Sequence, residues 1–152
     1  SVAEDKLEQL GIFLMERVAP AVAAARQSAS LGIDAAVTVE GATLELIEEL
    51  AQVGPFGSGN SEPRMVVSGA RIVRANVVGK GHVRCILAGA TGKRLTAIAF
   101  RAAGEELGHM LLSASEGPLH LAGNLRINRW QDRDDPQLII QDAAPAERDD
   151  FA

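Results

Sequence analysis

The change from a helical to a strand pattern after residue 63 is the feature that most constrains the fold. From Met65 onward, short apolar runs alternate with glycine-rich turns, as antiparallel strands require. Strands are expected at Met65–Val78, His82–Ala88, Arg94–Phe100, Leu119–Ile127 and Gln137–Gln141, and a helix at Ala102–Ser113. The order is therefore three strands, one helix and two strands.

This order of elements, within about eighty residues, predicts an OB-type barrel of five strands. Gly69 and Gly123 support the prediction, because they lie inside long strands at points where the strands of a small barrel must bend sharply. An unrelated small barrel, or half of an α+β domain, would give a similar pattern. The fold class is predicted as α+β, with a five-stranded OB-fold β-barrel over residues 64–142 preceded by a mainly helical segment.

The segment before the barrel begins with a helix expected from about Ala3 to Ala25. Its apolar residues recur at spacings of three and four and so share one face: Leu7, Leu10, Leu14, Val18 and Val22. Pro20 is expected to kink or divide the helix. Because such a face must pack against something, the segment is expected to complete a larger domain that lies upstream.

A short strand at Ile33–Val39 and a second helix at Leu44–Val53 follow, with Thr43 as the expected N-cap of the helix. The next residues, 55–63, are rich in glycine, proline and asparagine and show no apolar period, which indicates a structured connector. The chain is therefore divided into a helical segment at 1–54, a connector at 55–63, the barrel at 64–142 and an acidic tail at 143–152.

The net charge of −5 is unevenly distributed along the chain. Residues 1–63 carry three basic and ten acidic side chains, whereas residues 64–142 carry eleven basic and seven acidic ones. A local excess of cations is typical of a phosphate-binding surface, although an ordinary solvated face can also produce it.

Hydrolytic or metal chemistry needs carboxylates or histidines that converge on one point, and the chain offers little of this kind. The three histidines lie far apart in the sequence. Asp132, Asp134 and Asp135 surround Arg133 in an expected loop, where a solvated turn is favoured over a metal site. No phosphate-binding loop, nucleophile elbow or dinucleotide fingerprint appears. The chain itself is therefore predicted to be non-catalytic and to hold no cofactor.

The single cysteine, Cys85, lies in an apolar run and is expected to be a small core residue. No stretch approaches the roughly 20 apolar residues that cross a bilayer, and residues 1–29 contain no basic leader or cleavage signal. A soluble, cytoplasmic protein without a membrane partner is expected.

Binding of a single nucleic-acid strand requires only cations along a groove and flat groups on which bases stack. In an OB barrel, this surface is formed by the second and third strands and by the loops that join strands one to two and four to five. The candidate DNA-binding residues on these elements are Lys80, His82, Arg84, Arg94, Arg126, Asn128, Arg129, Trp130 and Arg133. Trp130 could stack a base or cap the barrel end, and Phe100 is expected in the core.

Residues 55–63, Pro-Phe-Gly-Ser-Gly-Asn-Ser-Glu-Pro, resemble the Pro-Phe-Gly-x-Gly-Asn-Pro-Glu-Pro stretch of the RecJ family of single-stranded-DNA-specific exonucleases. The likeness continues in the same order through Val78–Arg84, Leu95–Phe100 and Leu121–Leu125, followed by Arg129-Trp130. Ser61 replaces the usual proline, and Arg64 stands where an apolar residue is common. The resemblance covers essentially the whole chain.

The resemblance implies that residues 1–54 are similar to the end of a DHHA1 domain and residues 64–142 to the OB domain. An Asp-His-His nuclease domain that binds manganese or magnesium, and a Gly-Gly-His motif, would both precede this region. The parent enzyme would degrade single-stranded DNA from its 5′ end in recombination and repair, and this chain would hold the strand. The alternative is a protein-interaction or structural module without direct DNA contact, which the acidic first segment and acidic tail would suit.

Overall fold

The computed structural model describes residues 6–28, 30–113 and 117–146, and it divides the chain into two compact units at Gly32/Ile33. The first unit contains helix α1 (Leu7–Ser28), in which Pro20 lies without dividing the helix. Leu7, Leu14 and Val18, from its apolar face, are 46–56% exposed. Among the described residues, no helix is long and apolar enough to cross a membrane.

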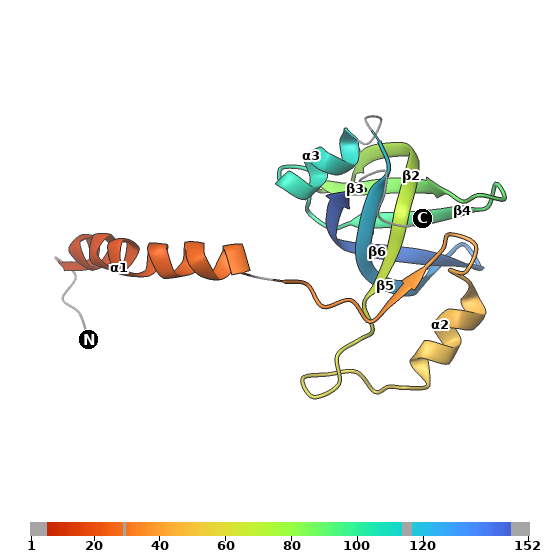
Figure 1. Ribbon diagram of the computed structural model, residues 1–152, viewed down its shortest axis with the longest axis horizontal. Helices are drawn as coiled ribbons and strands as arrows, with labels where there is room; N and C mark the ends of the chain where they lie inside the picture. The colour runs from red at the N-terminus through yellow and green to blue at the C-terminus, as the bar shows by residue number, and fades with distance from the viewer. Residues whose placement is uncertain (1–5, 29, 114–116, 147–152) are drawn as a thin grey trace. The chain divides into compact units, whose positions relative to one another are not determined.

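The second unit is built around a closed barrel of five strands, which confirms the expected OB fold (Figure 1). Its strands are β2 (Met65–Val78), β3 (His82–Ala88), β4 (Arg94–Ala99), β5 (Leu119–Trp130) and β6 (Arg133–Pro145). They are ordered β2-β3-β4-β6-β5, and β5 pairs again with β2. The pairs are antiparallel except β4–β6, which is parallel.

Strand alternation fills the barrel with small and branched apolar side chains. On β3 and β4, every second residue is buried: Val83, Cys85, Leu87, Leu95, Ala97 and Ala99. Each fully buried leucine stabilises the fold by roughly 1.5–3 kcal/mol. The expected core position of Cys85 is confirmed, and burial raises the pKa of its thiol to about 11.

The two glycines expected at barrel bends occupy irregular positions in their strands. Gly69 has a φ of +58°, and the β2–β5 register shifts between Val67 and Ala70 around it. A Cβ at Gly123 would overlap the carbonyl oxygen of Ile139, and the β5–β6 register shifts beside it. Gly123 is therefore required for β5 and β6 to approach this closely, and Gly69 adopts a backbone conformation that glycine favours.

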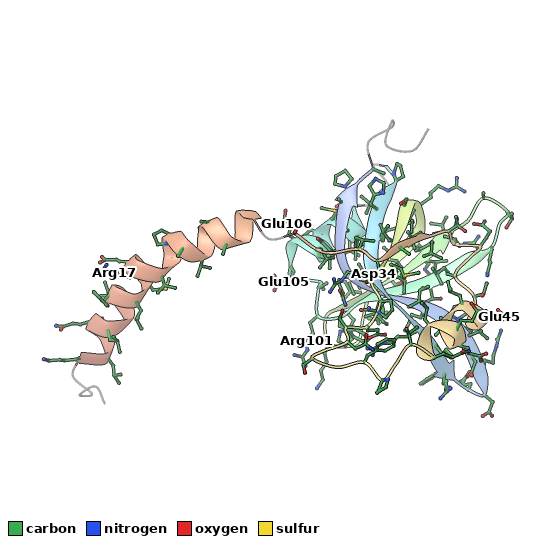
Figure 2. The ribbon with its side chains drawn as sticks, turned by 60° about the horizontal axis from the view of Figure 1, so that its bottom comes forward. Arg17, Asp34, Glu45, Arg101, Glu105 and Glu106 are labelled. Atoms are coloured by element: carbon green, nitrogen blue, oxygen red, sulfur yellow. The ribbon has the colours of Figure 1, made fainter. Side chains whose placement is uncertain are left out.

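Helices α2 (Leu44–Ala51) and α3 (Glu106–Leu112) lie at opposite ends of the barrel (Figure 1). Thr43 caps α2 as expected, because its Oγ1 accepts the N–H of Leu46 at 3.2 Å. Each helix packs against the barrel through a buried side chain that belongs to the core, Ile47 in α2 and Leu111 in α3. Figure 2 shows Glu45 on α2 and the Glu105–Glu106 pair at the start of α3.

Strand β1 (Ala35–Val37) pairs in parallel with the first residues of β2. Residues 33–54, expected to belong with the N-terminal helix, lie instead in the same compact unit as the barrel, because β1 and α2 contact its strands and core. The DHHA1-like character of the helical segment stays a prediction.

The connector at 55–63 is structured, as expected, and its asparagine holds the turn. The Asn60 amide donates to the carbonyl oxygens of Val53 and Pro55 at 3.0 and 3.2 Å. Gly57 and Asn60 also exchange two backbone hydrogen bonds, at 2.8 and 3.2 Å. These bonds give the Phe-Gly-Ser-Gly-Asn sequence a physical role in turning the chain between α2 and β2.

The prediction of a loop between residues 128 and 137 is wrong, because β5 and β6 extend through this segment as a long hairpin. The turn consists of Gln131 and Asp132 alone, with φ values of +51° and +59°. Positive φ at both turn residues is the geometry of a type I′ hairpin, whose twist matches that of the strands. The strands here are exposed and polar, so no apolar alternation marks them in the sequence.

Candidate nucleic-acid interface

Strand registers bring alternate, outward-pointing residues of neighbouring strands into rows across the barrel. One row runs from Asn76 through Arg84 and Ile98 to Ile139. The next runs from Arg74 through Ile86 and Thr96 to Gln137 and on to Arg126 of β5. We call the surface formed by these rows and their flanking outward residues the barrel face: Arg71, Arg74, Asn76, His82, Arg84, Ile86, Arg94, Thr96, Ile98, Phe100, Arg126, Gln137 and Ile139.

Four arginines of the barrel face, Arg71, Arg74, Arg84 and Arg94, are exposed, and none forms an ion pair with another described residue. Residues 64–104, which contain β2, β3 and β4, carry eight basic and no acidic side chains. The three half-buried isoleucines form an apolar strip between these cations. The face therefore combines an apolar floor with uncompensated positive charge, which suits an anionic ligand that also has apolar faces.

The sequence-predicted residues of β3 and β4 come together on or beside this face. Arg84 and Arg94 lie on it, His82 lies at its edge, and Lys80 lies in the turn between β2 and β3. Arg71 and Arg74 are absent from the residues predicted from sequence, because their position follows only from the register of β2 against β3. The acid-free run from 64 to 104 is the sequence signal that could have found them.

Phe100 lies on the barrel face and is 58% exposed, so its expected core position is wrong. Leu95, Ala97 and Ala99 point inward on β4, which makes the even-numbered residues point outward. The ring of Phe100 meets His82 at 5.2 Å between centroids and an interplanar angle of 77°. His82 is held in turn, because its Nδ1 accepts the backbone N–H of Arg101 at 2.9 Å.

Arg126 of the hairpin is already paired with an acidic side chain of the connector. Its Nη2 and Nε donate to the two carboxylate oxygens of Glu62 at 2.6 and 3.0 Å. These hydrogen bonds and the charge of Glu62 raise the pKa of the Arg126 guanidinium. A phosphate that contacts Arg126 would have to share its guanidinium with this carboxylate or displace it.

A network around Asn124 fixes the position of Glu62. The buried Asn124 amide donates to the carbonyl oxygens of Glu62 and Pro63 at 3.3 and 2.8 Å, and its oxygen accepts from Gln141. Gln141 accepts from Arg64 Nε at 2.7 Å. Because buried amides need partners, this network holds the connector against β5 and β6.

The other hairpin residues lie at its exposed tip. Arg129 Nε approaches Asp134 at 3.5 Å, and Asn128 lies opposite Asp135. Trp130 lies opposite Arg133 and is 70% exposed, which excludes the alternative that its ring caps the barrel end. The predicted residues thus form two groups, one on β3, β4 and the turn before β3, and one on the β5–β6 hairpin, where Arg126 also belongs to the barrel face.

Among the described residues, no group of three or more His, Cys, Asp or Glu side chains could hold a metal ion. An apolar groove of about 360 Å³ lies between α2 and β5, with Phe56 and Ile127 in its walls and Arg126 and Arg129 at its side.

The closed five-stranded barrel with a cationic outer face defines the chain as an OB-fold domain. The family model of the RecJ OB domain matches residues 33–142, and the chain belongs to this family. Its match begins at Ile33, where the second compact unit also begins.

The single-stranded-DNA-specific exonuclease RecJ of Bacillus subtilis (strain 168) is 31% identical over 117 residues, which is 76% of this chain. The chain spans only 14% of the length of that relative. Among solved structures, RecJ of Thermus thermophilus in complex with Mn²⁺ is similar, with a TM-score of 0.57 and 23% identity over 87% of this chain and 20% of that one. The Mg²⁺ complex of RecJ from the same organism gives a TM-score of 0.49 and 26% identity over 68% of this chain and 15% of that one.

Proposed function

We propose that this OB domain binds single-stranded DNA as the non-catalytic part of a RecJ-like exonuclease that degrades the strand in the 5′ to 3′ direction during recombination and repair. The observation that carries the proposal is the barrel face, with four arginines that lack acidic partners among the described residues. Family membership supports it, since the Bacillus subtilis relative is named as specific for single-stranded DNA.

The geometry suits an extended strand held mainly by its backbone. Outward residues on one strand of the barrel recur every two residues, or roughly 6.6 Å. Arg84 on β3 lies opposite Ile98, four residues along β4 from Arg94, so the two cations are offset by roughly 13 Å along the strands and can contact different phosphates, with release of their counterions. Ile86 and Ile98 offer apolar contact to bases, and neither arginines nor isoleucines so placed favour one base over another.

The chemistry of strand cleavage would be supplied by domains outside this chain. The proposed partners are single-stranded DNA and an upstream nuclease domain that binds manganese or magnesium, and the proposed location is the cytoplasm. In the parts of the chain that the structure describes, no group of side chains fits a metal ion. Highly purified protein incubated with manganese and single-stranded DNA should therefore show no nuclease activity.

Titration of a fluorescent oligonucleotide of about 15 nucleotides tests the proposal, with single-stranded and duplex forms compared between about 50 and 200 mM salt. We expect the single strand to bind more tightly and its affinity to fall with salt. The double variant Arg84→Ala/Arg94→Ala should weaken binding and flatten the salt dependence by roughly 0.7 logarithmic units per lost phosphate contact.

Arg17→Ala is the matched control, because it removes an exposed arginine from α1 and leaves the barrel unchanged. It should alter neither the affinity nor the salt slope. Absence of binding at the lowest salt would overturn the proposal and favour a protein-interaction or structural role instead.

A further inference from the structure

Phe100 and His82 form an exposed aromatic pair at the edge of the barrel face nearest the β2–β3 turn. Phe100 is 58% exposed, whereas the preceding residue, Ala99, is fully buried. A single exposed apolar side chain is ordinary on a protein surface. This ring differs because its neighbours fix it in place.

The backbone after β4 fixes the pair. Arg101 has a φ of +56°, a left-handed conformation that residues other than glycine rarely adopt. In this conformation its N–H donates to His82 Nδ1 at 2.9 Å, while the imidazole meets the Phe100 ring at 5.2 Å. Unusual backbone conformations of this kind are often found at binding sites, where they preorganise side chains.

Three exposed cations flank the pair along the chain. Lys80 precedes His82 in the turn, Arg84 lies two residues further along β3, and Arg101 follows Phe100. All three side chains are exposed, and no acidic residue occurs between residues 64 and 104. A rigid ring framed by cations matches a ligand in which a flat base hangs from an anionic backbone.

We propose that Phe100, braced by His82, stacks one nucleobase of a single strand that lies along the barrel face. The inference rests on the proposed function and adds to it the residue that contacts a base at the β2–β3 end of the site. Because the ring is already held, it loses little side-chain freedom when a base stacks on it. The remainder of the strand then runs over Ile98 and the arginines toward the β5–β6 hairpin.

The test measures binding of the full chain at low salt to two probes of equal length, an oligothymidine and an abasic oligonucleotide that keeps the phosphates. Phe100→Leu should weaken oligothymidine binding roughly 5- to 150-fold, the range expected for loss of one stacked base. It should leave abasic binding unchanged. Phe100→Tyr, which keeps the ring, should retain wild-type affinity for both probes.

Phe13→Leu is the matched control, because it makes the same change at a phenylalanine of α1 that is 53% exposed and lies in the first compact unit, outside the barrel unit. It should not alter binding. Unchanged oligothymidine affinity in Phe100→Leu would overturn the stacking proposal while DNA binding by the wild type stands, and so would an equal loss on both probes. Failure of the wild type to bind either probe would instead remove the proposed function itself.

Discussion

The cations of the barrel unit differ in whether a carboxylate already holds them. Arg126 forms a two-pronged pair with Glu62, and Arg129 lies 3.5 Å from Asp134. Arg84 and Arg94 form no such pair within the described part of the chain. An arginine that must give up a carboxylate gains less from a phosphate, so position on the face alone does not determine its contribution to DNA binding.

Replacement of Glu62 by glutamine should therefore tighten binding of single-stranded DNA. The change removes the negative charge that holds Arg126 and leaves the backbone carbonyl of residue 62 available to Asn124. Because exposed ion pairs contribute roughly 0.2–1 kcal/mol, we expect a gain of at most about fivefold at low salt. In the wild-type background, Arg126→Ala should weaken binding less than Arg84→Ala, as measured by fluorescence anisotropy. Equal losses in the two arginine variants would show that the Glu62 pair does not restrain Arg126.

Trp130 allows a separate prediction, because it is the only tryptophan and is 70% exposed. Trp130→Ala should change the free energy of unfolding by no more than about 0.5 kcal/mol, as at other exposed sites. If the ring stacks a base, the variant should lose roughly 1–3 kcal/mol of binding free energy with an unchanged salt slope. Quenching of tryptophan fluorescence on DNA addition gives an independent measurement. No quenching together with unchanged affinity would remove Trp130 from the site.

At the scale of elements, the turn between β3 and β4 is held from outside by the segment that precedes α2. The Glu40 carboxylate accepts the N–H and the hydroxyl of Thr91 at 2.9 and 3.2 Å. Lys93 Nζ donates a hydrogen bond to the backbone carbonyl oxygen of Glu40 at 3.0 Å. The backbone N–H of Thr91 is the main cause that lowers the pKa of Glu40 from its ordinary value of 4.5.

A lowered pKa in the folded state means that the Glu40 carboxylate stabilises the fold at pH values above 4.5 and loses this contribution as the pH falls through the lowered value. Glu40→Gln should therefore reduce the melting temperature near pH 7 but bring the two proteins together in acid. Melting curves of both proteins across this range measure the effect. A constant difference at all pH values would mean that packing, not charge, accounts for the role of Glu40.

How well the sequence predicts the fold differs from one strand to another. The bounds of β2 and β3 agree with expectation, because apolar alternation and the Gly79-Lys80-Gly81 turn mark them. The outer half of the β5–β6 hairpin could not be predicted, because backbone pairing holds it together and its exposed side chains show no apolar alternation. Alternation along a strand also does not show whether its odd- or even-numbered residues face the core. For this reason the sequence predicts Phe100 in the core, although the odd-numbered residues of β4 are the buried ones. The partners of Arg126 depend on contacts far apart in the sequence.

At the scale of the whole molecule, the barrel needs residues that precede its first strand. Val39, Ala42 and Ile47 are all buried in the same core as the strands, and Asp34 exchanges hydrogen bonds with Arg64 at 2.8 Å. Residues 33–54 thus belong to the barrel by contact, although the change of sequence pattern comes later, at residue 64. Two truncated chains test whether the folding unit begins at residue 33 or after the connector.

A chain that begins at Ile33 should melt at the same temperature as the full chain and bind single-stranded DNA equally well, because the second compact unit is complete in it. A chain that begins at Pro55 should be much less stable, since it loses Val39 and Ile47, each worth roughly 1.5–3 kcal/mol of burial. Urea unfolding, followed by circular dichroism, compares the three proteins on one scale. Equal stability of the Pro55 chain would place the folding boundary at the connector, and destabilisation of the Ile33 chain would show that α1 contributes to the barrel. Because its barrel face retains every arginine, the Ile33 chain also tests whether the second compact unit suffices for DNA binding.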